Sequence, residues 1–441
     1  MTRQQPARNS AWSATLPRAV ALRRAAIVTL LATTTLNVSG AMAASGATET
    51  TDSPASPWHI NGEIELQYEA ERNFDLDSRE NENEAVLEPE LDLEIGYRPT
   101  PLFQGFARLE LTREYGVGGE AENESARLKL AELYVSSQEI EMPGGGEISL
   151  YVGRRLFADE RQWLYDEQLD GVTMIYDYNA WSFLLSATRQ QEKDLLSNRQ
   201  EDEADYYIAR SRYQLDQRTL GAYLIKRHER DDNGARPLFV GIQSFGELWG
   251  STDYWLELAH VRGDDGDSEI RGWGLDAGAI YHFDAPLSPS LIAGYAFGSG
   301  DANPGGVDRA FRQTGLQDNE QDLGGLVNFD YLGLVLDPGL SNLRVWTAGV
   351  GLQPHDHISA QLLWHRYRQD HASENLRDTN LDAAPNGTDP DLGYAIDLVL
   401  GAEVSKSIEL EGVVGYFRPG GAFAESKDNA LFLGLKIEYE F

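Results

Sequence analysis

Basic side chains recur at every second position in several short segments of this sequence. Arg127 and Lys129 alternate with leucines, and Arg210 and Arg212 stand two residues apart in the same way. Residues i and i+2 of an extended strand lie on one face. Guanidinium and ammonium groups gathered on one face can bind carboxylates or phosphates, and Arg does so through two parallel hydrogen bonds. The spacing therefore indicates an anion-binding surface built on strands.

The same period of two runs through most of the chain. In the segment Leu431–Phe441, apolar residues occupy one face and mostly polar residues the other. Similar segments occur at 60–69, 87–97 and 273–283. Many segments of about ten residues with aromatics at their ends favour a transmembrane barrel over a soluble sandwich. The ending on Phe441 resembles the C-terminal signal of barrels inserted into the bacterial outer membrane.

Short and long connections alternate between these segments, as periplasmic turns and extracellular loops do in outer-membrane barrels. Both termini of such a barrel lie in the periplasm, so the number of strands must be even. Parity therefore assigns Gly325–Leu336, although strand-like, to one very long outer loop after Ser299. The expected fold is all-β: a transmembrane antiparallel β-barrel of about 18 strands with long extracellular loops, wide enough for an aqueous channel.

The N-terminus has the features of a processing signal. Arg18, Arg23 and Arg24 precede a short apolar run that ends in Ala41-Met42-Ala43, an A-x-A cleavage pattern. The expected organisation is a signal peptide at 1–43, a flexible lead-in at 44–57 and the barrel at 58–441. Together with the barrel, the signal predicts location in the bacterial outer membrane. The absence of Cys is compatible with an oxidising compartment.

We take the leucine-rich face of each strand as its lipid face, so the basic residues on the opposite face are predicted to point into the lumen. This places Arg108, Arg155 and Arg344 in the lumen together with the two alternating pairs named above. Arg154 shares its parity with Val152, but a bulge could turn it inward. One interpretation is a positive track for anions facing an acidic wall on the first two strands. The other is that these cations only pair with the inward acids of that wall.

The overall charge excludes a nucleic-acid partner, and the absence of known motifs argues against several kinds of metal, catalytic and phosphate-binding site. The chain has 71 acidic and 37 basic residues, a formal net charge of -34, which excludes a nucleic-acid partner. None of the eight His stands in a zinc-binding spacing, and there is no G-x-S-x-G or phosphate-binding loop. Gly263–Glu269 could hold Ca²⁺ through its oxygens, but a solvated acidic loop is favoured. We expect no catalytic residue, metal or cofactor.

Several longer motifs resemble the alginate-export family of outer-membrane barrels, over about residues 60–441. The most specific is Phe311-Arg312-Gln313-Thr314-Gly315-Leu316-Gln317. The others are Gly153-Arg154-Arg155-Leu156-Phe157 with Leu169-Asp170-Gly171, Gly298-Ser299-Gly300-Asp301, Leu336-Asp337-Pro338-Gly339-Leu340-Ser341-Asn342-Leu343, and Trp364-His365-Arg366-Tyr367-Arg368-Gln369. The resemblance implies an 18-stranded barrel whose electropositive pore passes polyuronate.

The resemblance also implies roles for individual basic residues. Residues implied to line the path are Arg108, Arg127, Lys129, Arg155, Arg210 and Arg344, and parity adds Arg212. Candidates near the outer rim are Arg154, Arg161, Arg189, Arg366 and Arg368. The acidic overall charge departs from an electropositive pore, so the identity of the polymer stays open.

The expected function is passive export of an anionic exopolysaccharide, with alginate first. The alternatives are a general anion-selective porin or nutrient-uptake channel and, third, an outer-membrane enzyme or adhesin that uses the long loops. An exporter should prefer uronate polymers over small anions, whereas an enzyme needs a side-chain constellation that fails on one substitution. The expected partners are the polysaccharide, outer-membrane lipids and periplasmic components of a secretion system.

Overall fold

The structure is a computed structural model, and it describes residues 56–79, 83–119, 121–191, 195–196, 204–230, 234–266, 268–302, 305–423 and 428–441. The predicted signal peptide at 1–43 and nearly all of the predicted lead-in at 44–57 lie outside these residues. Among the described residues, no helix has the length and hydropathy needed to cross a bilayer. The secondary structure of the described ranges consists of strands and one short 3-10 helix, η1 (Gly421–Phe423).

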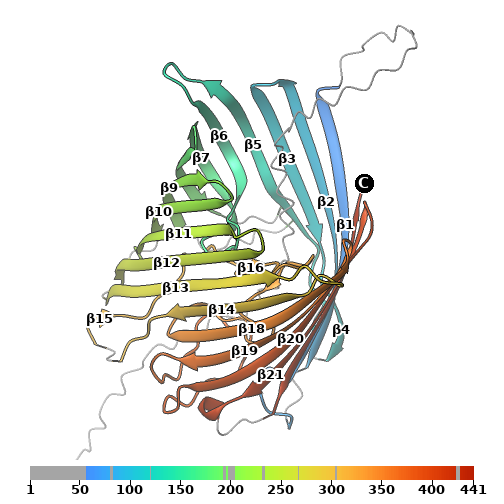
Figure 1. Ribbon diagram of the computed structural model, residues 1–441, viewed down its shortest axis with the longest axis vertical. Coiled ribbons are helices and arrows are strands. Elements are labelled where there is room, and N and C mark those ends of the chain that lie inside the picture. The colour runs from blue at the N-terminus through green and yellow to red at the C-terminus, as the bar shows by residue number, and fades with distance from the viewer. Residues whose placement is uncertain are drawn as a thin grey trace, which may run out of the picture.

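Eighteen antiparallel strands form a closed barrel (Figure 1), which confirms the predicted fold. They are β1 (Trp58–Arg72), β2 (Glu84–Thr100), β3 (Phe103–Thr112), β5 (Arg127–Glu141), β6 (Glu147–Ala158), β7 (Asp166–Tyr178), β8 (Trp181–Gln190), β9 (Ala204–Leu215), β10 (Arg218–Glu229), β11 (Leu238–Leu248), β12 (Thr252–Asp265), β13 (Ser268–His282), β14 (Ser290–Gly298), β18 (Leu343–His355), β19 (Ile358–Gln369), β20 (Asp391–Ser405), β21 (Ile408–Pro419) and β22 (Ala430–Glu440). The last strand, β22, pairs with β1 and closes the barrel.

Four further short strands lie in the connections. β4 (Tyr115–Gly119) extends the pairing of β2 beyond β3, and β15 (Val307–Asp308) pairs with β13 in parallel. β16 (Glu320–Gln321) and β17 (Phe329–Asp330) form a separate two-stranded sheet. Gly325–Leu336 therefore does belong to the connection between β14 and β18, as parity predicted, and it contributes no barrel strand.

The alternation of the sequence becomes the two faces of the barrel wall. On β22, Leu435, Ile437 and Tyr439 are exposed on the outer face, whereas Lys436 and Glu438 are buried on the inner face. Tight turns at one end join consecutive strands through residues that tolerate the left-handed conformation. Asn179 (φ 52°) lies between β7 and β8, and Asp216 (φ 52°) between β9 and β10.

The long connections lie at the other end, with one correction. The expectation of an acidic loop at Gly263–Glu269 is wrong, because β12 continues to Asp265 and β13 begins at Ser268. The two strands extend as a hairpin, and residues 264 and 269 are paired across it. The favoured interpretation of this segment as a solvated loop is therefore wrong about its conformation, which is that of two paired strands.

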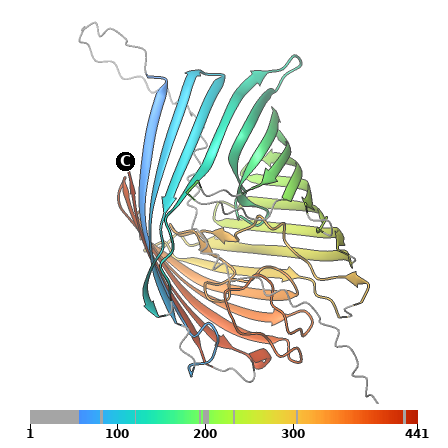
Figure 2. The same cartoon turned by 180° about the vertical axis from the view of Figure 1, so that it is seen from behind.

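The apolar core lies inside the barrel. Leu323, Val327, Leu334 and Val335 belong to the connection after β14 and are buried against the inner wall. In Figure 1, β16 of this connection lies within the outline of the barrel, whereas β15 lies beyond the strand ends, and Figure 2 shows the same arrangement from behind. We call residues 309–341 the lumen segment. Sequence parity located this connection at the outer end, but the chain folds back inward from there.

Candidate substrate path through the barrel

An acidic wall covers the inner face of five adjacent strands, β21, β22, β1, β2 and β3. Glu409 of β21 lies opposite Glu438 of β22 in the register. Glu438 lies opposite Glu65 of β1, and Glu65 lies opposite Glu90 of β2. Like charges directly opposed in an antiparallel pair repel one another. Four neighbouring strands therefore carry a continuous row of carboxylates, which gives this side of the interior a negative potential.

A buried lysine partly offsets this row. The Nζ atom of Lys436 lies 3.2 Å from a carboxylate oxygen of Glu411, and 3.9 Å from one of Glu65 and one of Glu438. The carboxylate oxygens of Glu63, Glu65 and Glu438 lie within 4.8 Å of one another, as do those of a second group, Glu90, Asp92 and Glu110. Such oxygen groups are the ligand type that hard divalent cations use.

An arginine face lies on β6 and β9, formed by Arg155, Arg210 and Arg212. The guanidinium of Arg155 lies over the rings of Tyr151, at 4.3 Å, and Phe157, at 5.3 Å. Its buried Nη1 has no hydrogen-bond partner in the described part of the chain. An unsatisfied buried donor is costly, so an acceptor that bound this guanidinium would remove that cost.

The two arginines of β9 contact the loop that follows β6. Arg210 donates to the hydroxyl of Tyr165 at 2.6 Å. Arg212 donates two hydrogen bonds to Glu160, at 2.5 and 2.6 Å, in the two-pronged geometry typical of carboxylate recognition. These contacts orient both side chains toward the interior.

Three further predicted residues lie between the acidic wall and the arginine face. Arg108 donates to Asp92 at 2.9 Å, and Arg127 pairs with Glu124 and lies 3.6 Å from Glu114. Lys129 lies opposite Glu110 in the register of β3 and β5. All three face inward, and their acidic neighbours show that pairing with the wall is part of their role. That they line a substrate path stays a prediction.

Arg161 was expected near the outer rim, but the structure buries it inside the barrel. Its Nη2 lies 3.0 Å from a carboxylate oxygen of Asp276 on β13. Its guanidinium lies 4.2 Å from the ring centroid of Trp255 and 3.9 Å from that of Tyr331. Because Tyr331 belongs to the lumen segment and Asp276 to the wall, Arg161 fastens the segment to the wall.

Polar side chains of the inner wall hold the lumen segment at several more points. Tyr367 donates to the carbonyl of Leu332 at 2.9 Å, and Gln361 donates to that of Leu323 at 2.6 Å. The backbone amide of Leu326 donates to the Ser359 hydroxyl at 3.0 Å. These wall residues satisfy backbone groups that an irregular buried segment would otherwise leave unpaired. The segment is therefore docked by specific contacts.

One acidic group of the lumen segment carries a strongly shifted pKa. Burial raises the pKa of Glu320 well above its usual value, and the charges of Asp318, Asp330 and Asp166 raise it further. The charge of Lys436 acts in the opposite direction. The docked segment therefore favours the protonated form of this carboxyl group, which links docking to pH.

Five of the predicted path residues face away from the lumen: Arg154, Arg189, Arg344, Arg366 and Arg368. On β18, Leu343 and Val345 are buried inside, while Trp346 and Val350 are exposed outside on the face of Arg344. Leu343 and Val345, which were expected to face lipid, are inward because the lumen segment packs inside this wall. The assignment of Arg344 to the pore is therefore wrong, and Arg366 and Arg368 lie on the same outer face of β19.

Arg154 and Arg189 also face outward, because the alternation of their strands continues without interruption. Arg154 keeps the parity of Val152, and no bulge turns it inward. It pairs with Asp170 at 2.9 Å, and Arg189 pairs with Asp205 at 3.0 Å. These two residues form ion pairs on the outer face and do not contribute to the interior.

Sequence reasoning missed several interior residues that hold the site together. Lys436, Asp276 and the buried pair of His365 and Asp397, whose side chains approach within 3.3 Å, were not singled out. Each stands at an inward position of an alternating strand. For Lys436, Asp276 and Asp397, the available signal was a polar residue whose two strand neighbours are both apolar. His365 stands next to Arg366 and gives no such signal.

Comparisons with known proteins agree with this architecture. The sequence model of a family described as alginate export matches residues 57–431. No curated protein matches the chain. Similar solved structures are proteins of Pseudomonas aeruginosa, among them the outer membrane protein opdK, with TM-score 0.56, 12% identity and coverage of 87% of this chain and 99% of that one. They include OccK2 (OpdF), with TM-score 0.57, 11% identity and coverage of 87% of this chain and 97% of that one, and OpdO, with TM-score 0.56, 15% identity and coverage of 87% and 97%. At such identities the likeness shows the fold alone.

Proposed function

The chain belongs to the alginate export family, and we propose that it exports an anionic exopolysaccharide passively, with alginate as the first candidate. It is an outer-membrane barrel of the porin type, a fold that forms channels. In the proposed mechanism, uronate carboxylates pass along the arginine face, while the counter-ions of the polymer pass along the acidic wall. The concentration gradient of newly made polymer drives the transport, so no catalytic group is required.

The observation that carries this proposal is the geometry of Arg155. Its guanidinium is held between two aromatic rings on the inner wall, and its Nη1 lacks a hydrogen-bond partner among the described residues. Most other arginines of the interior pair with acids. A fixed guanidinium with a free donor suits a carboxylate that arrives and leaves, because it costs little side-chain entropy.

A deletion strain tests the proposal directly. Without the channel, polyuronate should accumulate in the periplasm and fall in the medium, and the wild-type gene should restore secretion. Arg155→Gln should restore secretion only in part, whereas the outward variant Arg154→Gln should restore it fully. Unchanged secretion in the deletion strain would rule out export as the function.

The acidic wall favours a second candidate, a channel for small cations. The continuous carboxylate row would attract cations into the barrel. Reversal potentials in a salt gradient separate a general anion porin from a cation channel, because the two give potentials of opposite sign. Block of the current by added polymer then separates an exporter from both. Block by polyuronate that exceeds block by monomeric uronate at equal charge would favour the exporter over both alternatives.

Two further expectations accompany the proposal. Residues 1–43 act as a signal peptide, and mass spectrometry of the mature protein should find its N-terminus near Ala44. Periplasmic components of a polysaccharide secretion system would deliver the polymer to the end of the barrel that carries the short turns. Cross-linking from that end in cells would identify such components.

A further inference from the structure

Most basic residues on the outer face of the barrel lie near one of its two ends. Among the described residues, they stand where strands meet the long connections, and each shares its face with lipid-facing apolar neighbours. They are Arg72, Arg113, Arg154, Arg189, Lys226, Arg262, Arg271, Arg344, Arg366, Arg368 and Arg418. At the end with the short turns, the described basic residues are Arg98, Arg218 and Lys406. The asymmetry points to a partner on one side of the membrane.

The densest part of this distribution is a group of four that we call the basic patch: Arg344, Arg366, Arg368 and Arg418. Arg344 of β18 lies directly opposite Arg368 of β19. Arg366 lies opposite Tyr394 of β20, which lies opposite Arg418 of β21. Four guanidinium groups are therefore carried by a strip of four adjacent strands.

Local acids neutralise only half of the basic patch. Asp370 pairs with Arg344, and Asp391 pairs with Arg366 at 2.8 Å. Arg368 and Arg418 are exposed. The Arg418 side chain interacts with tyrosines, chiefly Tyr394, and pairs with no carboxylate among the described residues. The basic patch therefore keeps a net positive charge, although the whole chain has a net charge of -34.

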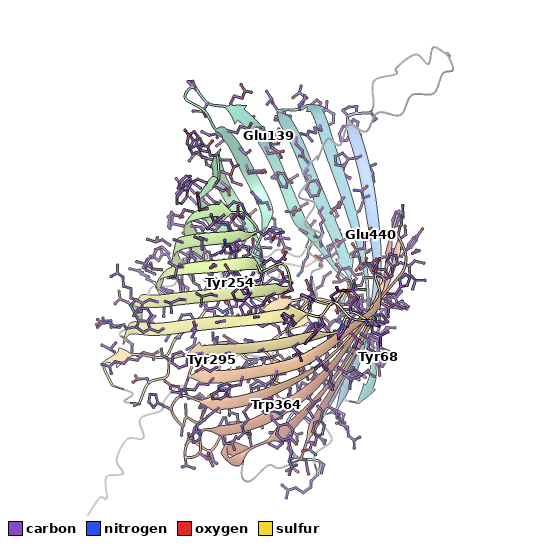
Figure 3. All side chains as sticks on the ribbon, viewed as in Figure 1. Tyr68, Glu139, Tyr254, Tyr295, Trp364 and Glu440 are labelled. Atoms are coloured by element: carbon purple, nitrogen blue, oxygen red, sulfur yellow. The ribbon has the colours of Figure 1, made fainter. Side chains whose placement is uncertain are left out.

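An aromatic girdle fixes the position of the basic patch relative to the bilayer. Trp346 and Trp364 are exposed on the outer face of β18 and β19, and Tyr295 lies opposite Trp346. Figure 3 labels Tyr295 and Trp364 on this wall of the barrel. Aromatic girdles mark the boundary between hydrocarbon and headgroups. The basic patch continues this girdle toward the long connections, so it lies at headgroup level.

The register brings like charges together in the basic patch. Arg344 and Arg368 are opposed across an antiparallel pair, where like charges repel. Asp370 pairs with Arg344, and Asp391, which pairs with Arg366, lies opposite Arg368 in the register, so these two acids offset part of the repulsion and a further anion would offset the rest. Arg binds phosphate through two parallel hydrogen bonds. At headgroup level, the groups that offer such phosphates are those of membrane lipids.

We propose that the basic patch binds the phosphate groups of a phosphorylated glycolipid of the outer leaflet, of the lipid A type. The lipid's acyl chains lie against the aromatic girdle and the apolar wall below it. Arg368 and Arg418 supply the uncommitted charge, while Arg344 and Arg366 share their charge between the lipid and Asp370 and Asp391. This role goes beyond export, because the patch faces away from the path.

Native mass spectrometry of the detergent-solubilised full chain, titrated with purified lipid A, tests the proposal. The parent should bind bisphosphorylated lipid A more tightly than lipid A stripped of both phosphates. Each exposed cation near a charged surface contributes about fivefold, so R368Q/R418Q should weaken binding about 25-fold. R368K/R418K, which keeps the charge, should retain most of the affinity.

The matched control is R218Q/K406Q, which removes two cations from the other end of the barrel and should leave lipid A binding unchanged. If R368Q/R418Q does not fold, the parent's affinity should still fall steeply between low and high salt, because screening weakens charge contacts. Equal weakening in both double variants, or no preference for phosphates, overturns the proposal. So does binding of soluble polyuronate at the basic patch in place of lipid A.

The same variants separate this proposal from the proposed function. R368Q/R418Q should lose lipid A binding and keep polyuronate block of the channel. Loss of block in this variant with lipid binding intact would show that the basic patch serves the polymer. A channel that passes no polyuronate at all would leave the lipid A result unaffected.

Discussion

The arginines of β9 and those of β19 have the same spacing and opposite surroundings. Arg210 and Arg212 contact the loop inside the barrel, whereas Arg366 and Arg368 lie on the outer face. The difference arises from what lies inside each wall. The lumen segment packs on β19, so its inner face carries buried Tyr367 and Leu363. Alternation defines two faces, but the packing partner decides which face meets lipid.

The largest expected difference between inward and outward arginines concerns stability. Arg161→Ala leaves Asp276 buried without its cation, and breaking a buried pair costs about 3–5 kcal/mol of unfolding free energy. Arg368→Ala should change stability little, because the side chain is exposed. Urea unfolding followed by heat-modifiable gel migration measures both.

A double variant checks that the unpaired carboxylate is the cause. R161A/D276A should recover much of the loss, because no buried charge remains without a partner. Equal stability changes in R161A and R368A would mean that Arg161 does not fasten the lumen segment to the wall.

Thiol labelling tests which of these arginine positions a reagent in the channel can reach. The chain has no Cys, so single thiols can be placed freely. A charged methanethiosulfonate reagent should reduce the current of R210C, because the modified side chain lies inside the barrel. The same reagent should leave the current of R366C unchanged. A current change of similar size in both would contradict the assignment of faces.

A smaller effect is expected from pH. Because burial raises the pKa of Glu320, the docked lumen segment binds a proton that the released segment loses. Docking is therefore favoured at low pH and weakened as pH rises through that raised pKa. Conductance should be higher at pH 8 than at pH 5. The ratio should be at most about tenfold for each unit by which the pKa of Glu320 differs between the docked and the released segment. Glu320→Gln should reduce this difference, and an unchanged pH dependence would exclude Glu320 as its source.

Much of the fold could be predicted from the sequence, because period-two alternation is a local property. The pattern of β22 and the requirement for an even strand number led to a closed barrel of 18 strands, and Gly325–Leu336 was correctly assigned to a connection. The extended hairpin of β12 and β13 was missed, because its acidic Gly-containing tip resembles a loop.

The site was less predictable, because irregular segments carry no period. Arg161 precedes β7 in a loop, and only tertiary packing shows that it lies between Trp255 and Tyr331. Arg344 was assigned to the wrong face, because Leu343 and Val345 resemble lipid-facing residues although they pack on the lumen segment. Both errors have one cause, an apolar segment folded into a barrel whose lumen was expected to be polar.

Polyuronate block in planar bilayers tests the central claim most directly, namely that inward cations line the path. The fourfold variant R127A/K129A/R210A/R212A should weaken block at low salt by tenfold or more, since each partly screened charge contributes roughly 1 kcal/mol or less. The effect should shrink at 1 M salt, where the Debye length is about 3 Å. The outward variant R344A/R366A/R368A/R418A, with the same loss of charge, should keep the parent's block. Unchanged block in the inward variant, or equal loss in both, would contradict the account.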